Sequence, residues 1–130
     1  MLGLLVGRRA WILVVALFVG YACWQDSGSI RGELVARFDL ARGHYIILAL
    51  GYPPHWRPEY ARLLRERYGI EERFVAGCMV DRPLFDYAEA YNTISMSAIN
   101  RKFGRDVFQE TAIEASRNWA LSHSGRVRSR

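Results

Sequence analysis

The sequence holds few of the residues that catalytic and metal-binding sites most often use. It has two cysteines, Cys23 and Cys78, and three histidines, His44, His55 and His123. None of them follows the short spacings, such as C-x-x-C or H-x-x-x-H, that metal sites use. A glycine-rich phosphate loop and a G-x-S-x-G nucleophile motif are also missing. The sequence therefore predicts no metal site and no cofactor.

The excess positive charge of the chain is confined to its two ends. The formal net charge is +5 and the isoelectric point is about 9.6. Five terminal arginines equal this excess: Arg8, Arg9, Arg126, Arg128 and Arg130. A domain that binds nucleic acid carries its basic residues on the folded surface. We therefore expect no nucleic-acid partner.

Length and composition predict one globular domain. The chain has 130 residues, of which 51% are hydrophobic and 24% charged. This length allows a single domain, and this hydrophobic content is that of an ordered protein. The sequence contains no internal repeat that would indicate a solenoid.

Residues 1–24 predict a signal peptide or an N-terminal membrane anchor. Arg8 and Arg9 precede an uncharged apolar run from Ala10 to Trp24. This is the order of the positive and apolar regions of a signal peptide. The run is short for a membrane-spanning helix, which needs about 20 residues. We prefer a cleaved signal peptide. The alternatives are an uncleaved anchor and a buried helix of a soluble protein.

The end of the apolar run fits a processing site. Gly20 and Ala22 are small residues two positions apart, which fits cleavage before Cys23. A small residue before Cys23 also leaves lipidation of that cysteine open. By the positive-inside rule, both the cleaved and the anchored forms place the N-terminus in the cytoplasm and the rest outside.

Residues 44–81 predict a strand, a helix and a second strand. Tyr45–Leu50 is an unbroken apolar run, as expected of a strand buried on both faces. The helix should begin near Pro58 and end at Gly69, which favours a left-handed cap. The second strand is expected over Arg73–Val80. Two strands joined by one helix are most simply parallel.

The segments on either side complete the predicted domain over residues 33–122. The polar stretch 25–32 is rich in glycine and serine and predicts a linker. Glu33–Arg42 fits either a short strand or one to two turns of helix, and we prefer a short helix because several of its residues favour helix. Residues 123–130 are expected to form a basic, disordered tail.

Two helices should follow the second strand. Asp81 fits the N-cap of a long helix over Arg82–Phe103, which Gly104 ends. Asp106 then opens the last helix. The predicted fold class is α/β. It comprises one small domain with a β-α-β unit in a mainly parallel small sheet, two helices after it and a hydrophobic helix before it.

The edge of the sheet beyond the strand ends is the predicted binding site, because open α/β sheets usually bind ligands there. Five residues should gather at this edge: Tyr52, His55, Trp56, Arg57 and Asp81. Aromatic side chains and arginine are enriched at binding hot spots. The alternative is that Tyr52 and Trp56 only cover the sheet edge and anchor the next helix.

Cys78 with His55 forms the candidate catalytic pair. A single cysteine near a histidine can act as a nucleophile. The alternative, which we prefer, is that Cys78 is a small buried hydrophobe beside Gly77. A disulfide with Cys23 is not expected. Thiol titration separates a reactive Cys78 from an inert one.

Part of the chain resembles a family of small bacterial proteins of uncharacterised activity. The resemblance covers about 43–108 and rests on GHY, GYPPHW, EYARLLRERYGIEERFVAGCMV, YNTISMSAINRKFG and DVF. It implies an ordered bacterial domain and carries over no functional residue.

These patterns together predict an exported or membrane-tethered domain of the bacterial cell envelope. We expect a non-catalytic module that binds a protein or a small ligand. The alternative is a small thiol-dependent or hydrolytic enzyme that uses Cys78 with His55. The expected partners are the membrane, through residues 1–24, and a protein partner or a second copy, because a two-stranded sheet is small.

Overall fold

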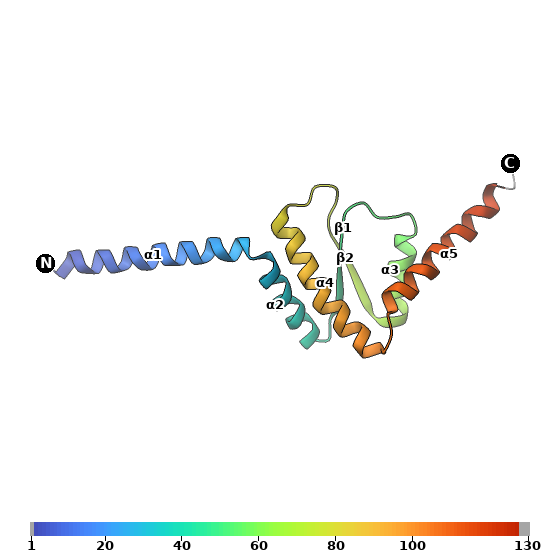
Figure 1. The fold of residues 1–130 in the computed structure, drawn as a ribbon, viewed down its shortest axis with the longest axis horizontal. Helices are drawn as coiled ribbons and strands as arrows, with labels where there is room; N and C mark the ends of the chain where they lie inside the picture. Colours follow the sequence, from blue (N-terminus) through green and yellow to red (C-terminus); the bar gives the residue numbers. More distant parts are fainter. Residues whose placement is uncertain (1, 128–130) are drawn as a thin grey trace.

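The computed structural model describes the backbone of residues 2–127 and the side chains of residues 10–24 and 27–124. These residues form five helices and one parallel two-stranded sheet (Figure 1). The elements are α1 (Leu2–Asp26), α2 (Gly28–Ala41), β1 (Tyr45–Leu50), α3 (Arg57–Tyr68), β2 (Ile70–Ala76), α4 (Arg82–Phe103) and α5 (Val107–Val127). The prediction of a small α/β domain with parallel strands is confirmed in this broad form, although the domain is mostly helical.

The two strands pair in parallel along most of their length. The register begins with Tyr45 opposite Ile70 and ends with Leu50 opposite Ala76. An irregularity between Ala49 and Leu50 shifts the pairing near the end of β1. The parallel arrangement follows because α3 returns the chain to the same end of the sheet.

The predicted bounds of the second strand, Arg73–Val80, are wrong. The strand is Ile70–Ala76, so it begins directly after the left-handed Gly69, whose φ is 65°. The apolar residues Met79 and Val80 follow the strand and do not belong to it. The reason is the length of the partner, because β1 ends before two prolines that cannot extend a ladder.

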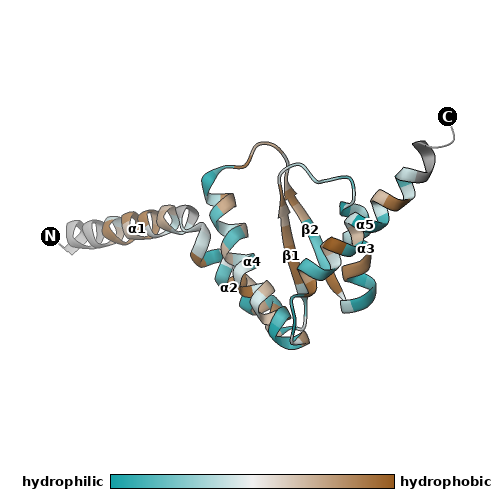
Figure 2. Ribbon diagram, turned by 45° about the vertical axis from the view of Figure 1, so that its right-hand side comes forward, coloured by the Kyte–Doolittle hydropathy of each residue, from teal (hydrophilic) through white to brown (hydrophobic). Residues whose placement is uncertain are grey.

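Helices cover the sheet from two sides, and each side has its own core (Figure 1). Alternate side chains of a strand point to opposite faces. Ile47 packs with residues of α3 and α5, whereas Ile46 and Leu48 pack with Ala36 of α2 and Tyr91 of α4. Figure 2 colours most of β1 as apolar. The buried strand explains why its sequence lacks polar alternation.

α4 takes the place of a third strand beside β1. The side-chain amide of Asn92 accepts from the N–H of Leu48 at 2.8 Å and donates to the carbonyl of Leu48 at 2.7 Å. The hydroxyl of Ser95 donates to the carbonyl of Ile46. These side chains satisfy backbone groups that a buried edge strand would otherwise leave unpaired. The sheet can therefore stop at two strands.

α2 packs on α4 through two glycines. Gly28 and Gly32 are buried, together with Ala36 one turn further on. A Cβ atom on Gly28 would lie 2.2 Å from the carbonyl oxygen of Pro83, and one on Gly32 would lie 2.2 Å from that of Tyr87. Only residues without a Cβ allow the two backbones to approach this closely.

The predicted linker over 25–32 is therefore wrong for most of its length. α1 continues to Asp26, α2 begins at Gly28, and Ser27 alone separates them. The predicted helix Glu33–Arg42 exists, but it begins five residues earlier than expected, at Gly28. Gly28 and Gly32, a residue type common in loops, are packing residues of a helix.

A partly buried hydrogen bond also joins α2 to α4. The Tyr91 hydroxyl donates to a carboxylate oxygen of Asp39 at 2.7 Å. Burial, reinforced by this carboxylate, raises the pKa of Tyr91. Burial likewise raises the pKa of Tyr60, on α3, to about 12. Both hydroxyls therefore stay protonated to a higher pH than that of an ordinary tyrosine.

The predicted ends of α3 and α4 are confirmed. Gly69 and Gly104 are left-handed C-caps, with φ values of 65° and 69°. Asp81 accepts from the N–H of Leu84 at 2.9 Å, as an N-cap should. Asp106 likewise accepts from the N–H of Gln109 at 3.1 Å at the start of α5.

The predicted disordered tail over 123–130 is wrong in its first part. α5 remains helical to Val127, and residues 128–130 lie outside the described residues. α5 is held to α3 by a two-pronged ion pair, in which Arg67 donates to Glu114 at 2.6 and 2.7 Å.

α1 projects away from the rest of the molecule (Figure 1). Among the described residues, no single helix is both long and apolar enough to cross a bilayer. The segments Ala10–Trp24 and Gly28–Ala41 pass that test only as a pair, and they meet at 77°. Whether α1 is a signal peptide or an anchor stays a prediction.

Candidate functional site

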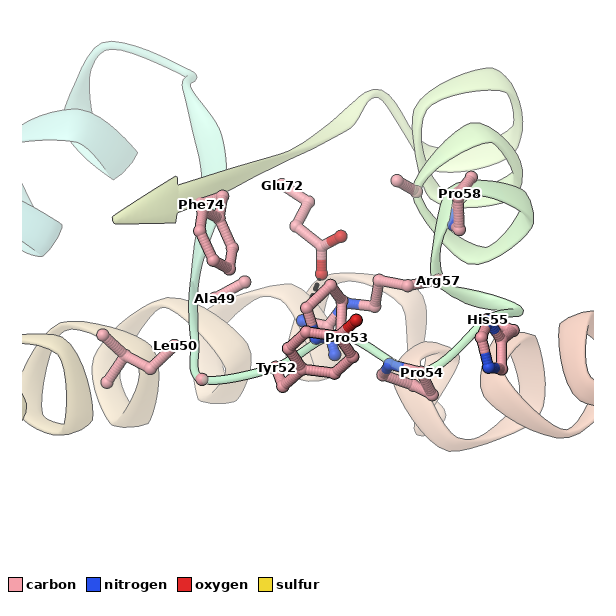
Figure 3. A pocket seen from close by; sticks show the side chains of 12 residues that line it. Ala49, Leu50, Tyr52, Pro53, Pro54, His55, Arg57, Pro58, Glu72 and Phe74 are labelled. Atoms are coloured by element: carbon pink, nitrogen blue, oxygen red, sulfur yellow. Dashed lines mark ion pairs between the residues drawn. The ribbon is translucent and has the colours of Figure 1, made fainter. Parts of the chain in front are cut away.

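The loop between β1 and α3 borders an open groove of about 470 Å³ (Figure 3). Twelve residues line it: Ala49, Leu50, Gly51, Tyr52, Pro53, Pro54, His55, Arg57, Pro58, Ala61, Glu72 and Phe74. They come from β1, the following loop, the first turns of α3, and β2. Ligand sites in proteins are commonly 300–1,000 Å³ and mostly apolar, so size and lining suit a ligand.

Proline and glycine shape the loop side of the groove. Gly51 has a φ of 81°, a conformation that other residues rarely adopt. Pro53 and Pro54 then restrict the backbone of the loop. Tyr52, which lies between Gly51 and Pro53, is 85% exposed. An exposed aromatic side chain on a restricted loop loses little conformational entropy when it meets a partner.

Two residues of β2 form the opposite wall. Glu72 and Phe74 are two residues apart in the strand, so they lie on the same face, and both point into the groove (Figure 3). Phe74 is 59% exposed, which is unusual for a large apolar residue in a strand. The groove thus places two exposed aromatic residues, Tyr52 and Phe74, on separate elements that face one another.

An ion pair crosses the floor of the groove. Arg57, at the start of α3, pairs with Glu72, whose side chain is only 8% exposed. The Nε of Arg57 is buried and has no hydrogen-bond partner among the described residues. A buried donor without a partner costs about 1–3 kcal/mol. A water or a ligand oxygen that reached Nε would recover part of this cost.

α5 contacts one groove residue, His55. The His55 ring stacks on Trp119, with ring centroids 5.7 Å apart and planes at 13°. Trp119 in turn stacks on His123 at 4.3 Å. The last helix therefore reaches the site, a link that no local sequence pattern announces.

Three of the five predicted binding residues lie in the groove, namely Tyr52, His55 and Arg57. Trp56 does not line it, because its ring is half-buried and packs edge-on against Tyr60 at 5.8 Å. Trp56 thus anchors α3, as the alternative interpretation expected. Asp81 lies outside the groove as well and serves as the N-cap of α4.

Cys78 is exposed, which contradicts its expected place in a buried strand. It follows β2 in the segment that leads to α4, and it does not line the groove that contains His55. His55 instead stacks on Trp119. The structure therefore gives the proposed pair no described contact. Among the described side chains, those of residues 10–24 and 27–124, no group of three or more acidic, histidine or cysteine residues lies close enough to hold a metal ion.

Comparison with protein-family models, curated proteins and solved structures finds no match for this chain.

Sequence reasoning missed Glu72, Phe74 and Trp119. The two-residue period of β2 places Glu72 and Phe74 on the same face as the buried Ile70, so a correct strand start would have found them. No sequence signal could have placed Trp119 next to His55, because that contact depends on how α5 returns across α3.

Proposed function

We propose that this protein is a membrane-tethered, non-catalytic domain of the bacterial cell envelope that binds an extended protein segment in the groove. The groove between Tyr52 and Phe74 carries the proposal. The tether would be α1, whose apolar run Ala10–Trp24 follows two arginines. Since Ser27 alone separates α1 from α2, the domain would stay close to the bilayer.

A protein segment fits the groove because an edge strand borders it. β2 pairs with β1 on one side, and no further strand pairs with it in the described part of the chain. Extended segments bind such edges through their backbone, and their alternate side chains enter neighbouring pockets. An apolar side chain next to Phe74 would meet the mostly apolar wall of the groove.

The exposed aromatic ring of Phe74 should be needed for peptide binding. Random peptides displayed on phage would be selected on the full chain held in lipid nanodiscs. We expect enriched peptides that contain apolar residues, and we expect Phe74→Lys to weaken their binding at least tenfold. Lysine removes the apolar wall, and a residue that is 59% exposed tolerates the change with little loss of stability.

The matched control is Phe85→Lys, because Phe85 is also an exposed phenylalanine but lies on α4, outside the groove. Arg57 is a poorer test residue, since its removal would leave Glu72 buried without its counterion. The proposal fails if no selected peptide distinguishes Phe74→Lys from Phe85→Lys. An enzyme that uses Cys78 with His55 stays the alternative, and no contact of the described residues favours it.

A further inference from the structure

The outer face of α2 carries an apolar stripe. Ile30, Leu34 and Phe38 recur every four residues and are 59%, 52% and 58% exposed. Residues four apart share one face of a helix. This face lies opposite the one that packs on α4 through Gly28 and Gly32, so the body of the domain leaves it uncovered.

Arginines border the stripe on both sides. By the helical period of 3.6 residues, Arg31 falls on one side and Arg37 on the other. Arg31 lies over the Tyr87 ring at 5.9 Å, and Arg42, at the end of the helix, lies over the Phe38 ring at 4.7 Å.

Acidic residues lie farther from the stripe. Glu33 is turned toward α4, where it lines a hollow with Asp86 and Glu89. Asp39 is held by the Tyr91 hydroxyl on α4. Among the described side chains of α2, the charges nearest to the stripe are therefore positive. An apolar face bordered by arginine is the pattern of a helix that lies in a membrane interface.

The bend between α1 and α2 gives the geometry for such a placement. The two helical segments meet at 77°, so a membrane-inserted α1 would direct α2 along the bilayer surface. α2 also lies on the side of the domain from which α1 leaves, with α4 behind it (Figure 1). The apolar stripe of α2 thus follows the apolar surface of α1 beyond the bend between the two helices.

We propose that α2 lies in the interface of an anionic bilayer. Ile30, Leu34 and Phe38 enter the boundary of the acyl chains, and Arg31 and Arg37 contact the lipid phosphates. This proposal rests on the membrane attachment proposed above for α1. It orients the domain, because the groove then opens on the side of the sheet away from α2 and faces the solvent.

The test measures the depth of a fluorophore at three positions of the full chain, in a background of Cys23→Ser and Cys78→Ser. A nitrobenzoxadiazole label is attached to Leu34→Cys on α2, to Leu17→Cys in the apolar run of α1, and to Ile113→Cys on α5. Ile113 is the matched control because it is 52% exposed, as Leu34 is. The protein is reconstituted in nanodiscs of phosphatidylcholine and phosphatidylglycerol that contain lipids spin-labelled either near the headgroup or in the middle of the acyl chain.

We expect shallow quenching of the label at position 34 to be at least threefold stronger than at position 113, and to weaken when phosphatidylcholine replaces phosphatidylglycerol. Equal quenching at 34 and 113, with the label at 17 buried in lipid, would overturn the placement of α2 but keep the membrane attachment. A label at 17 that no lipid quenches would overturn both. If the label at position 34 is increasingly shielded from lipid as the number of chains per disc rises, the placement of α2 in the bilayer is also overturned. The stripe would then be covered by a second copy of the chain.

Discussion

Gly32→Ala should lower the free energy of unfolding by about 1–3 kcal/mol, the usual cost of overpacking a tight contact. In an ordinary helix the same change stabilises by about 1 kcal/mol, because alanine is the better helix former. Here the added Cβ would lie 2.2 Å from the carbonyl oxygen of Tyr87. Backbone atoms cannot turn away as a flexible side chain can, so α2 and α4 must separate. Gly32→Leu should prevent α2 from docking.

Urea unfolding of the full chain in detergent, followed by circular dichroism, measures this effect. Ser29→Ala is the control, since Ser29 is an exposed residue of the same helix and should change stability by less than about 0.5 kcal/mol. A Gly32→Ala protein at least as stable as the unaltered chain would contradict the close packing of α2 on α4.

Asn92→Leu should lower the free energy of unfolding by about 2–6 kcal/mol. The substitution leaves both the N–H and the carbonyl of Leu48 without their partner, at about 1–3 kcal/mol for each buried group. Leucine has a similar size, so the loss reports the missing hydrogen bonds more than a cavity. Total stabilities of small domains are about 5–15 kcal/mol, so this change removes a large part of the margin.

Hydrogen exchange of the Leu48 amide gives a second readout of the same contact. The amide should exchange faster in Asn92→Leu than in the unaltered chain, beyond the general loss of stability. Thr93→Ala is the control, because the Thr93 hydroxyl only donates to the carbonyl of Glu89 within the same helix. Unchanged stability and an equally protected Leu48 amide would show that α4 does not complete the sheet.

Local signals in the sequence predicted the elements whose ends are set by the chain itself. β1 is bounded by glycines and prolines, and the left-handed caps at Gly69 and Gly104 end α3 and α4. The N-cap at Asp81 starts α4 at the predicted residue. In each case the information lies within a few residues of the boundary, so no tertiary contact is needed to find it.

The same reasoning failed where a distant partner decides the structure. Gly28 and Gly32 weaken a helix by their intrinsic preference, yet they are required because α4 lies directly against them. β2 ends at Ala76 because β1 offers no residue to pair beyond Leu50. The exposed position of Cys78 follows from that shorter strand.

The candidate site was predicted only on the side that one loop provides. Tyr52, His55 and Arg57 lie close together in the sequence, so they can be recognised as the binding residues of one loop and the start of the next helix. The opposite wall of the groove cannot be predicted without the register of β2, which places Phe74 there. The contact between His55 and Trp119 cannot be predicted without the position of α5. A site built from three separate elements cannot be completed from local patterns.

The accessibility of Cys78 from outside the cytoplasmic membrane tests the central claim, a tethered domain that faces away from the cytoplasm. In a Cys23→Ser variant, Cys78 is the only thiol, and it is exposed. A membrane-impermeant maleimide added to bacterial spheroplasts should label Cys78 to the same extent before and after lysis, in protein that sediments with the membranes. Labelling that occurs only after lysis, or protein that stays in the soluble fraction, would contradict the account.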